Sequence, residues 1–308
     1  MNAGEIHAPG YVGRFAPSPT GPLHFGSLVA ALASWLDARA AGGRWLLRID
    51  DLDRPRCTAQ AEGEILRALE TFGLHHDGPV VRQHTRDAAY AAALDRLRAA
   101  GRVYPCACTR RELADSRLGA DGSAIYPGTC RPGLPPGRSA RAWRYAVGDD
   151  VIEFDDRIQG HARIALATDC GDFLVRRADD LFAYQLAAVV DDFDAGVSEI
   201  VRGADLFQST ARQIALQRAL GLPTPRYAHV PAAVNAAGEK LSKQTRAAPL
   251  DIADVPATLC RTLRFLGQAP PPDLAAATGD DVLAWARDNW RLERIPRSFT
   301  QPTSGAPC

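Results

Sequence analysis

Apolar residues recur along this chain with two spacings, and their alternation predicts strands followed by helices. Short apolar runs at 11–15 and 45–49 lead into stretches where apolar residues return every three or four positions, the period of an amphipathic helix. Glycines end each of these stretches. We therefore expect strands at 11–15 and 45–49, and helices that begin near 27 and cover 59–72 and 85–100. This order is typical of a parallel α/β sheet.

The pattern breaks between 103 and about 146, where cysteines, prolines and glycines replace regular spacing. We expect the remaining elements to be short β-like pieces at 151–154, 164–166 and 173–175, an apolar segment at 181–190, a strand at 199–202, helices at 209–220, 256–266 and 280–289, and no regular structure beyond. The expected fold class is α/β, a Rossmann-type parallel sheet split by an insertion, with a small helical C-terminal region. The expected parts are the two halves of the sheet domain at 1–102 and 181–249, the insertion at 103–180, and the C-terminal region at 250–308.

Composition places the chain among globular proteins and limits its partners. The 308 residues are 46% hydrophobic and 23% charged, unlike a disordered chain. The 36 basic and 36 acidic residues cancel, which argues against wholesale wrapping of nucleic acid but leaves room for a local arginine-rich face. No apolar run is long enough to span a bilayer, and the first residues lack the pattern of a secretory signal. With an odd count of seven cysteines, we expect a cytoplasmic protein with reduced thiols and no membrane partner.

Lysine is nearly absent from this chain, and the two lysines present stand together. All but two of the 36 basic residues are arginine, and the exceptions, Lys240 and Lys243, fall in the pentapeptide KLSKQ at 240–244. Two randomly placed lysines would lie this close with a probability of roughly 2%. A compact ammonium group on a flexible stem suits a mobile loop better than a rigid guanidinium does.

A phosphate-binding loop is indicated where the first expected strand leads into the first helix. Residues 22–27, PLHFGS, lie between them, and the unpaired N–H groups and the dipole at a helix N-terminus favour anions. Gly26 lets a phosphate approach the backbone without a Cβ, while His24 and Ser27 add hydrogen-bond donors. Such donors suit charge build-up on a phosphoryl group undergoing displacement. On these residues alone, an ordinary strand–helix turn with a surface histidine remains the alternative.

Two segments carry a resemblance to a known family. Residues 13–21, GRFAPSPTG, followed by LHFGS at 23–27, resemble the first signature of the class I glutamyl-type aminoacyl-tRNA synthetases, in which 24–27 corresponds to the HIGH element. The pentapeptide KLSKQ resembles the second signature, KMSKS, with Leu241 in place of Met and Gln244 in place of the last Ser. In that family ATP and an amino acid form an aminoacyl-adenylate, pyrophosphate leaves, and the acyl group passes to RNA.

The resemblance implies roles for the residues of both signatures. It implies ATP as a substrate, accompanied by Mg²⁺. The implied catalytic residues are His24, Ser27, Lys240 and Lys243, and the implied ATP-binding residues are His24, Gly26 and Lys243. His24 would stabilise the α-phosphate from one side, and Lys243 would neutralise the leaving pyrophosphate from the other. Lys240 would support the loop or the phosphates.

The resemblance also implies glutamate as the amino acid. The implied glutamate site consists of Arg14, Phe15, Ala16, Pro17, Ser18, Asp50, Tyr184 and Arg202. Arg202 suits a bidentate pair with a carboxylate, and Asp50 suits the ammonium group. Family members often have Glu where this chain has Asp50, so the reach of this carboxylate is one methylene shorter, and a bridging water or a small shift would compensate. Taken singly, residues 50–53 also fit a solvated turn, and Arg202 fits a salt bridge at a sheet edge.

Three cysteines of the insertion indicate a metal site. Cys106, Cys108 and Cys130 offer soft ligands in a poorly patterned stretch, the context in which a structural Zn²⁺ replaces a hydrophobic core. Spacing alone does not supply the fourth ligand, and three cysteines without metal remain the alternative. The resemblance points to Tyr126 as the fourth ligand, so we expect one structural zinc in the insertion.

The length of the chain restricts the resemblance to a short branch of the family. Only 64 residues follow Gln244, too few for the large helical anticodon-binding region of a full glutamyl-type synthetase. A short branch of the family lacks this region and attaches glutamate to the modified base queuosine in the anticodon of tRNA(Asp). The resemblance to that branch implies glutamate and the queuosine-carrying anticodon stem-loop of tRNA(Asp) as partners of a monomeric enzyme.

Other functions stay open on the sequence alone. The chain fits a truncated conventional synthetase that charges a tRNA 3′ end, a HIGH-type nucleotidyl transferase acting on a small acid, or a non-catalytic RNA-binding paralogue. The retained His24, Lys240 and Lys243 disfavour the last of these. Candidate phosphate contacts are the clustered arginines, which fit a solvated surface equally well: Arg138, Arg141, Arg144, Arg176, Arg177, Arg291, Arg294 and Arg297.

Overall fold

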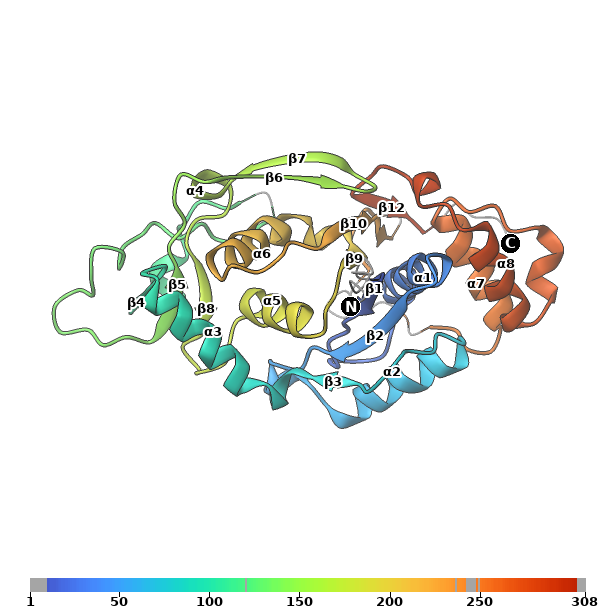
Figure 1. Cartoon of the computed structure of the whole chain (residues 1–308), viewed down its shortest axis with the longest axis horizontal. Coiled ribbons are helices and arrows are strands. Elements are labelled where there is room, and N and C mark those ends of the chain that lie inside the picture. The colour runs from blue at the N-terminus through green and yellow to red at the C-terminus, as the bar shows by residue number, and fades with distance from the viewer. Residues whose placement is uncertain (1–9, 120, 236, 242–247, 249, 304–308) are drawn as a thin grey trace, which may run out of the picture.

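A parallel sheet forms the centre of the computed structural model, which describes residues 10–119, 121–235, 237–241, 248 and 250–303. Strand β1 (Val12–Phe15) pairs in parallel with β2 (Arg44–Ile49), and β2 pairs with β3 (Val81–Arg82). On the other side of β1, strand β9 (Glu199–Gly203) pairs in parallel with β10 (Arg226–Val230). The Ser198 N–H donates to the carbonyl of Val12 over 3.0 Å, which joins β9 to β1. The two halves of the chain therefore meet at β1 and β9 (Figure 1).

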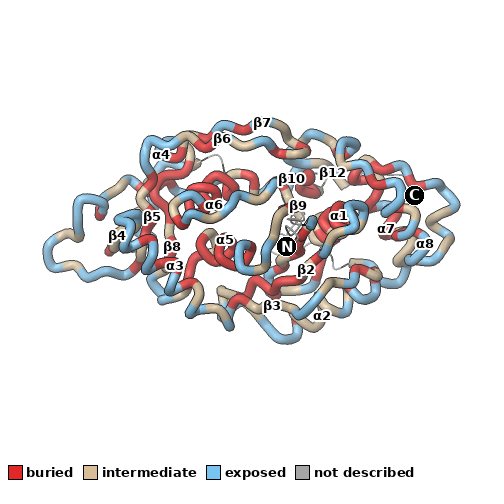
Figure 2. The backbone as a smooth tube through the Cα atoms, viewed as in Figure 1, coloured by how far each residue is buried: buried red, intermediate tan, exposed pale blue. Residues whose placement is uncertain are grey.

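Helices cover this sheet and bury its apolar residues. The helices are α1 (Phe25–Ala40), α2 (Ala59–Thr71), α3 (Asp87–Ala99), α4 (Leu166–Asp169), α5 (Tyr184–Asp194), α6 (Phe207–Ala219), α7 (Val255–Phe265) and α8 (Gly279–Asn289). Short 3-10 turns lie at Arg54–Arg56, Gln83–Thr85, Arg111–Leu113, Ala204–Leu206, Pro272–Ala276 and Leu292–Arg294. Helix α1 contacts β1, β2 and β9 and also α7 and α8, so it is buried along most of its length (Figure 2). This helix therefore joins the C-terminal helices to the sheet.

Residues 103–180 extend the fold with antiparallel pairs. Strands β4 (Val103–Cys106), β5 (Ala142–Tyr145) and β8 (Phe173–Arg176) form one antiparallel sheet. Strands β6 (Val151–Asp156) and β7 (Gly160–Ala165) form a hairpin, and β6 also pairs in parallel with β10 through Tyr227 and Asp156. This part of the chain thus reaches back to the central sheet at β10.

The parallel α/β sheet was predicted correctly, but some elements were not. Strand β10 and the short strand β11 (Ala232–Val234) were missed, because the apolar run there is interrupted by His229 and by a proline. The expectation of no regular structure after residue 289 was wrong, since β12 (Thr300–Pro302) pairs in parallel with β11. The apolar segment at 181–190 is mostly helix α5. Among the residues that the structure describes, no helix combines the length and the apolar character that a bilayer crossing requires.

Candidate active site

A cavity of about 720 Å³ opens where strands β1, β9 and β10 end. Strand order reverses between β1 and β9, and ligands of α/β sheets bind at such switch points beside the carboxyl ends of the strands. Most of the residues expected from sequence line this cavity: Arg14, Phe15, Ala16, Pro17, Ser18, His24, Gly26, Ser27, Tyr184, Arg202 and Lys240. Residues far apart in the chain are therefore brought to one site. Asp50 does not line it, and Lys243 lies outside the described residues.

The phosphate loop is organised around His24, the N-cap of α1. The Ser27 N–H donates to Nδ1 of His24 over 3.3 Å. Because Nδ1 accepts, Nε2 carries the hydrogen when the ring is neutral, so this side chain can donate to a phosphoryl oxygen in the cavity. A Cβ built on Gly26 would lie 3.3 Å from two atoms of the His24 ring. The glycine therefore leaves room for the imidazole as well as for a ligand.

Lys240 lines the same cavity and follows a turn after β11. The turn includes Gly238, whose φ of 80° lies in the left-handed region that glycine tolerates. The Leu241 N–H donates to the carbonyl of Ala233 over 2.8 Å, so the chain returns alongside β11. Lys240 Nζ donates to a carboxylate oxygen of Asp205 at 2.6 Å, and both side chains are substantially exposed. The lysine thus stands at the rim of the cavity, facing the region that follows β9.

Arg202 lies at the end of β9 and is only 5% exposed. Its Nη1 donates to Oε1 of Gln213 at 2.9 Å, and its Nη2 donates to Oγ1 of Thr210 at 2.8 Å. Its Nε donates to Nε2 of His229 at 3.0 Å. Among the ion pairs of the described residues, Arg202 has no carboxylate partner. A buried cation with neutral acceptors at the cavity wall suits an anionic ligand group.

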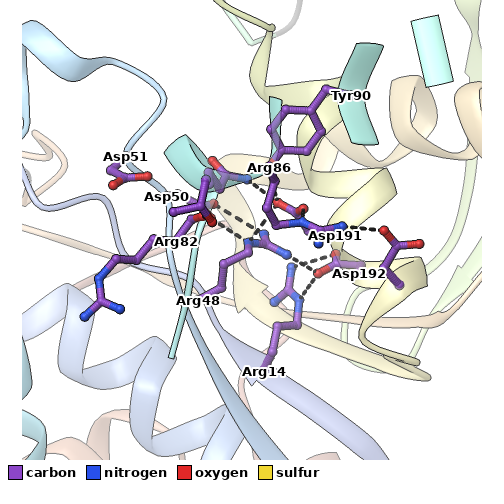
Figure 3. A network of polar contacts seen from close by, with 12 residues as sticks. Arg14, Arg48, Asp50, Asp51, Arg82, Arg86, Tyr90, Asp191 and Asp192 are labelled. Atoms are coloured by element: carbon purple, nitrogen blue, oxygen red, sulfur yellow. Dashed lines mark hydrogen bonds and ion pairs between the residues drawn. The ribbon is translucent and has the colours of Figure 1, made fainter. Parts of the chain in front are cut away.

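Arg14, by contrast, belongs to a buried network of charged groups (Figure 3). Its Nε donates to Asp192 at 3.1 Å, and Arg48 Nη1 donates to the same carboxylate oxygen at 2.6 Å. Asp191 accepts from Arg86 at 2.6 Å. Burial by itself would raise the pKa of Asp192, but Arg14 and Arg48 outweigh it and lower this pKa. The carboxylate of Asp192 therefore holds both arginines in place, and Arg14 also lines the cavity.

Asp50 forms part of this network and lies behind the cavity wall. Its two carboxylate oxygens accept from Nε and Nη2 of Arg48 at 2.6 and 3.4 Å. Burial and the neighbouring Asp191 and Asp192 raise the pKa of Asp50, against the opposing effect of Arg48. The Asp50 N–H donates to the carbonyl of Pro17, which does line the cavity. Because Asp50 is paired with Arg48 and does not line the cavity, its expected contact with a substrate ammonium stays a prediction.

The three cysteines expected to bind metal converge in the insertion. The Sγ atoms of Cys106, Cys108 and Cys130 lie within 4.8 Å of one another. The phenol oxygen of Tyr126 lies 3.6 Å from Cys106 Sγ and 3.3 Å from Cys108 Sγ. Burial would raise the pKa of Cys130, but hydrogen bonds from Tyr126 and a backbone N–H outweigh it and lower the pKa to about 7. Three thiols at this spacing could hold a metal ion, and the phenol of Tyr126 lies beside them.

The clustered arginines divide into two groups. Arg138 pairs with Glu112 at 2.6 Å, Arg177 pairs with Asp179 at 2.6 Å, and Arg176 lies 3.4 Å from Asp180. Arg144 is buried and stacks on the Tyr126 ring, 3.8 Å from its centroid. The others have no carboxylate partner among the described ion pairs and are exposed: Arg141, Arg291, Arg294 and Arg297. The second group is better suited to bind phosphates.

Comparison with known proteins identifies the family. The family model for class I tRNA synthetases (E and Q), catalytic domain, matches residues 11–131 and 141–270. The chain belongs to this family. Class I aminoacyl-tRNA synthetases are ligases that use ATP, and this synthetase is one of them.

Relatives and solved structures agree with this family. A glutamyl-Q tRNA(Asp) synthetase of Aromatoleum aromaticum is 58% identical over 299 residues, covering 97% of this chain and 95% of the relative. One from Thiobacillus denitrificans is 57% identical, covering 96% of this chain and 98% of the relative. The crystal structure of a glutamate-tRNA synthetase from Elizabethkingia anophelis superposes with a TM-score of 0.77 at 24% identity, covering 94% of this chain and 67% of that chain, and shows the same fold.

Several residues of this synthetase were missed by sequence reasoning. Asp192 binds both Arg14 and Arg48, and His229 binds Arg202. Their partners lie far away in the chain, 178 positions apart for Arg14 and Asp192. One local signal was present, because Asp191 and Asp192 directly follow an apolar run. Two adjacent carboxylates on the buried side of a helix require cations nearby.

Proposed function

We propose that this chain activates glutamate with ATP and transfers the glutamyl group to the queuosine base in the anticodon of tRNA(Asp). In the first step a glutamate carboxylate oxygen attacks the α-phosphorus of ATP, and the bond to pyrophosphate breaks. In the second step a nucleophilic group of the base attacks the carbonyl carbon of the glutamyl-adenylate, and AMP leaves. Both steps increase charge near phosphoryl or carboxyl oxygens, where positioned donors lower the barrier.

One observation carries the proposal. A single cavity holds a helix N-terminus with His24 and Ser27, a lysine at its rim, and the buried Arg202, which has no carboxylate partner among the described residues. The first group suits the phosphates of ATP, and the last suits the side-chain carboxylate of glutamate. This chain aligns with nearly the whole length of the relatives named glutamyl-Q tRNA(Asp) synthetase. Their name supports tRNA(Asp) as the acceptor of the glutamyl group.

The remaining parts of the site follow from the same proposal. Mg²⁺ would accompany ATP, and Lys243 would neutralise the leaving pyrophosphate. Asp50 would contact the ammonium group of glutamate after a shift away from Arg48, or through a bridging water. Zn²⁺ would be held by Cys106, Cys108, Cys130 and Tyr126 as a structural ion. We place the monomeric enzyme in the cytoplasm, with its tRNA substrate.

The decisive experiment measures where glutamate is attached. Labelled glutamate and ATP are incubated with tRNA(Asp) that carries or lacks queuosine, and the label is mapped after nuclease digestion. We expect label on the anticodon fragment of the queuosine-carrying tRNA alone. Label at the 3′ adenosine would identify a conventional charging enzyme, and no label with any tRNA would favour a non-catalytic RNA-binding protein.

Arg202 provides a second test, aimed at the amino acid. Arg202→Ala removes the buried cation at the cavity wall, so we expect glutamate-dependent ATP–pyrophosphate exchange to fall by about 100-fold or more, since hydrogen bonds between charged groups are strong. Arg202→Lys keeps the charge but loses the planar fork, and we expect an intermediate activity. Circular dichroism and the melting temperature check that each variant folds. Normal kinetics in a folded Arg202→Ala variant would contradict the assignment of glutamate.

A further inference from the structure

Among the described residues, the acceptors that hold Arg202 are all neutral, so the positions of the hydrogens on these acceptors control the orientation of its guanidinium. Gln213, Thr210 and the carbonyl of Leu206 accept from its Nη atoms, and His229 accepts from Nε. A carboxylate partner would hold the guanidinium by charge but would also compete with the substrate. These four neutral acceptors leave the positive charge of Arg202 available for a ligand. The orientation of the guanidinium then depends on the geometry of its hydrogen bonds.

His229 is the acceptor whose hydrogen position must be set. Arginine donates only, so Nε2 of His229 accepts from Arg202 Nε and carries no hydrogen. The hydroxyl of Thr210 lies 3.2 Å from the same nitrogen and, because it accepts from Arg202, it can donate its own hydrogen to the ring. The hydrogen of the neutral ring therefore sits on Nδ1. Burial lowers the pKa of His229 to about 4, which keeps the ring neutral near pH 7.

Asp156 supplies the partner that this tautomer requires. Its Oδ2 accepts from Nδ1 of His229 at 2.6 Å, and both side chains are completely buried. Its Oδ1 accepts from the N–H groups of Ile158, Gln159 and His229, so the carboxylate itself is fixed. The three residues come from three adjacent strands, since His229 pairs with Arg202 across β9 and β10, and β6 pairs with β10. The hairpin β6–β7 is thus connected to Arg202 at the cavity wall through the carboxylate of Asp156 and the ring of His229.

We propose that Asp156 and His229 are positioning residues, which orient the guanidinium of Arg202 toward the side-chain carboxylate of the substrate. Asp156 selects the Nδ1–H tautomer of His229, and this tautomer presents an acceptor to Arg202 Nε. The inference rests on the proposed function, because it takes Arg202 to bind glutamate. It adds a specificity role for two residues outside the cavity lining.

The variant Asp156→Asn tests the proposal because it changes the tautomer with little change of shape. The amide oxygen can still accept from the backbone N–H groups, while the amide nitrogen faces Nδ1 and donates to it. The ring hydrogen then moves to Nε2 and opposes Arg202 Nε–H, so the guanidinium must turn away. We expect the KM for glutamate in pyrophosphate exchange to rise by roughly 10- to 100-fold, the loss expected for one hydrogen bond to a charged group. The kcat and the KM for ATP should change by less than about threefold.

The neighbouring carboxylate provides the matched control. Asp155 lies on the same strand, pairs with His161 at 2.9 Å, and has a side chain that is 88% exposed. Asp155→Asn removes the same charge without touching Arg202, so its KM for glutamate should equal that of the wild type. Equal KM values for folded Asp155→Asn and Asp156→Asn would overturn the proposal, as would an equal loss in kcat and in the KM for ATP.

Two further measurements test the proposal even if the Asp156→Asn variant does not fold. In ¹⁵N-histidine NMR of the wild type, with the signal assigned by its loss in His229→Gln, we expect the Nδ1–H tautomer, and the Nε2–H tautomer would refute the mechanism. His229→Gln retains an oxygen that can accept from Arg202, so its KM for glutamate should be lower than that of His229→Leu. The reverse order would also refute it. Exchange with another amino acid in place of glutamate would instead reject the proposed function and leave the NMR result standing.

Discussion

At the scale of single residues, the phosphate loop depends on the absence of a side chain at Gly26. A methyl group there would press on the His24 ring, whose Cε1 and Nδ1 would lie 3.3 Å from it, and Ala233 limits the space on another side at 3.6 Å. We expect Gly26→Ala to displace the imidazole and to lower kcat for glutamate-dependent pyrophosphate exchange by about 10- to 100-fold, because donor placement controls the barrier. The global stability should change little.

A second glycine separates this effect from ordinary helix stabilisation. Gly63 lies inside α2, where an added Cβ would meet only the flexible end of Arg67. Gly63→Ala should stabilise the helix by about 0.5–1 kcal/mol and leave the kinetics unchanged. Urea unfolding and exchange kinetics of the two variants make the comparison, and equal kinetics for both would show that His24 tolerates the methyl group.

The buried His229 predicts a pH dependence of stability. Its pKa is lowered to about 4 by burial, below the value of about 6.5 in an unfolded chain. Between these values the unfolded chain binds a proton that the folded chain does not, so the free energy of unfolding falls as the pH falls from 6.5 to 4. The single group accounts for about 3 kcal/mol across this window.

Urea unfolding at pH 7, 6 and 5 measures this contribution. His229→Gln removes the titrating ring, so its stability should fall less steeply with decreasing pH than that of the wild type. His161→Gln is the control, since His161 is exposed and pairs with the exposed Asp155. Its stability should follow the wild-type slope, and parallel slopes for all three proteins would contradict a neutral buried His229.

Sequence reasoning identified residues better than it identified their partners. The signature residues around His24 and Lys240 are contiguous in the chain, so a local pattern reveals them. The acceptor groups that orient Arg14 and Arg202 come from α5, α6 and β10, and no local pattern pairs them. The placement of Asp50 shows the same limit, because its engagement with Arg48 depends on which way two buried side chains turn.

At the scale of elements, each expected helix is present, whereas several strands were not expected. Helix α1 was expected to begin near 27 and begins at Phe25, and α2 was expected at 59–72 and covers Ala59–Thr71. These helices have long repeats and clear glycine ends. Strand β10 has five residues and contains Arg226 and His229, which interrupt its apolar pattern. It is nevertheless buried, because Asp156 and Arg202 satisfy the histidine.

The thiol cluster of the insertion predicts a bound metal ion. Cys106, Cys108, Cys130 and Tyr126 form a small separate core between loops that contain few apolar residues. We expect about one zinc per chain in the purified protein, and we expect Cys108→Ser to lose most of it, because a hydroxyl is a poor ligand compared with a thiolate. Loss of the ion should expose residues 107–141 to limited proteolysis, since metal binding and folding are coupled at such sites.

Another cysteine serves as the control for this experiment. Cys57 is half-buried and lies outside the thiol cluster. Cys57→Ser should keep the zinc content and the protease pattern of the wild type. Metal analysis by mass spectrometry gives the readout, and a wild-type protein free of stoichiometric zinc would leave three cysteines without metal.

At the scale of the whole molecule, three exposed arginines near the C-terminal helices have no carboxylate partner among the ion pairs of the described residues. The C-terminal helices lie at one end of the molecule and the sheet of β4, β5 and β8 at the other (Figure 1). Arg291, Arg294 and Arg297 follow α8 and are exposed, whereas Arg138, Arg176 and Arg177 are paired with carboxylates near the other end. An arginine in an ion pair must break that pair before it binds a phosphate.

This difference predicts which arginines bind tRNA. We expect the triple variant Arg291→Gln, Arg294→Gln and Arg297→Gln to weaken tRNA(Asp) binding and to reduce the slope of log affinity against log salt by about 2 to 3, since each phosphate contact contributes about 0.7 in single strands and about 0.9 in a DNA duplex. The matched triple variant at Arg138, Arg176 and Arg177 should change the slope by less than about 1. Both variants should retain glutamate activation without tRNA, because none of these arginines lines the cavity.

The neutral net charge makes this measurement informative. With 36 basic and 36 acidic residues, long-range attraction to RNA is weak, so the salt dependence reports local contacts. Filter binding or fluorescence anisotropy between 50 and 200 mM salt covers the range where such slopes are measured. A larger change of slope for the paired arginines than for the C-terminal ones would place the RNA at the opposite end of the molecule, against the insertion.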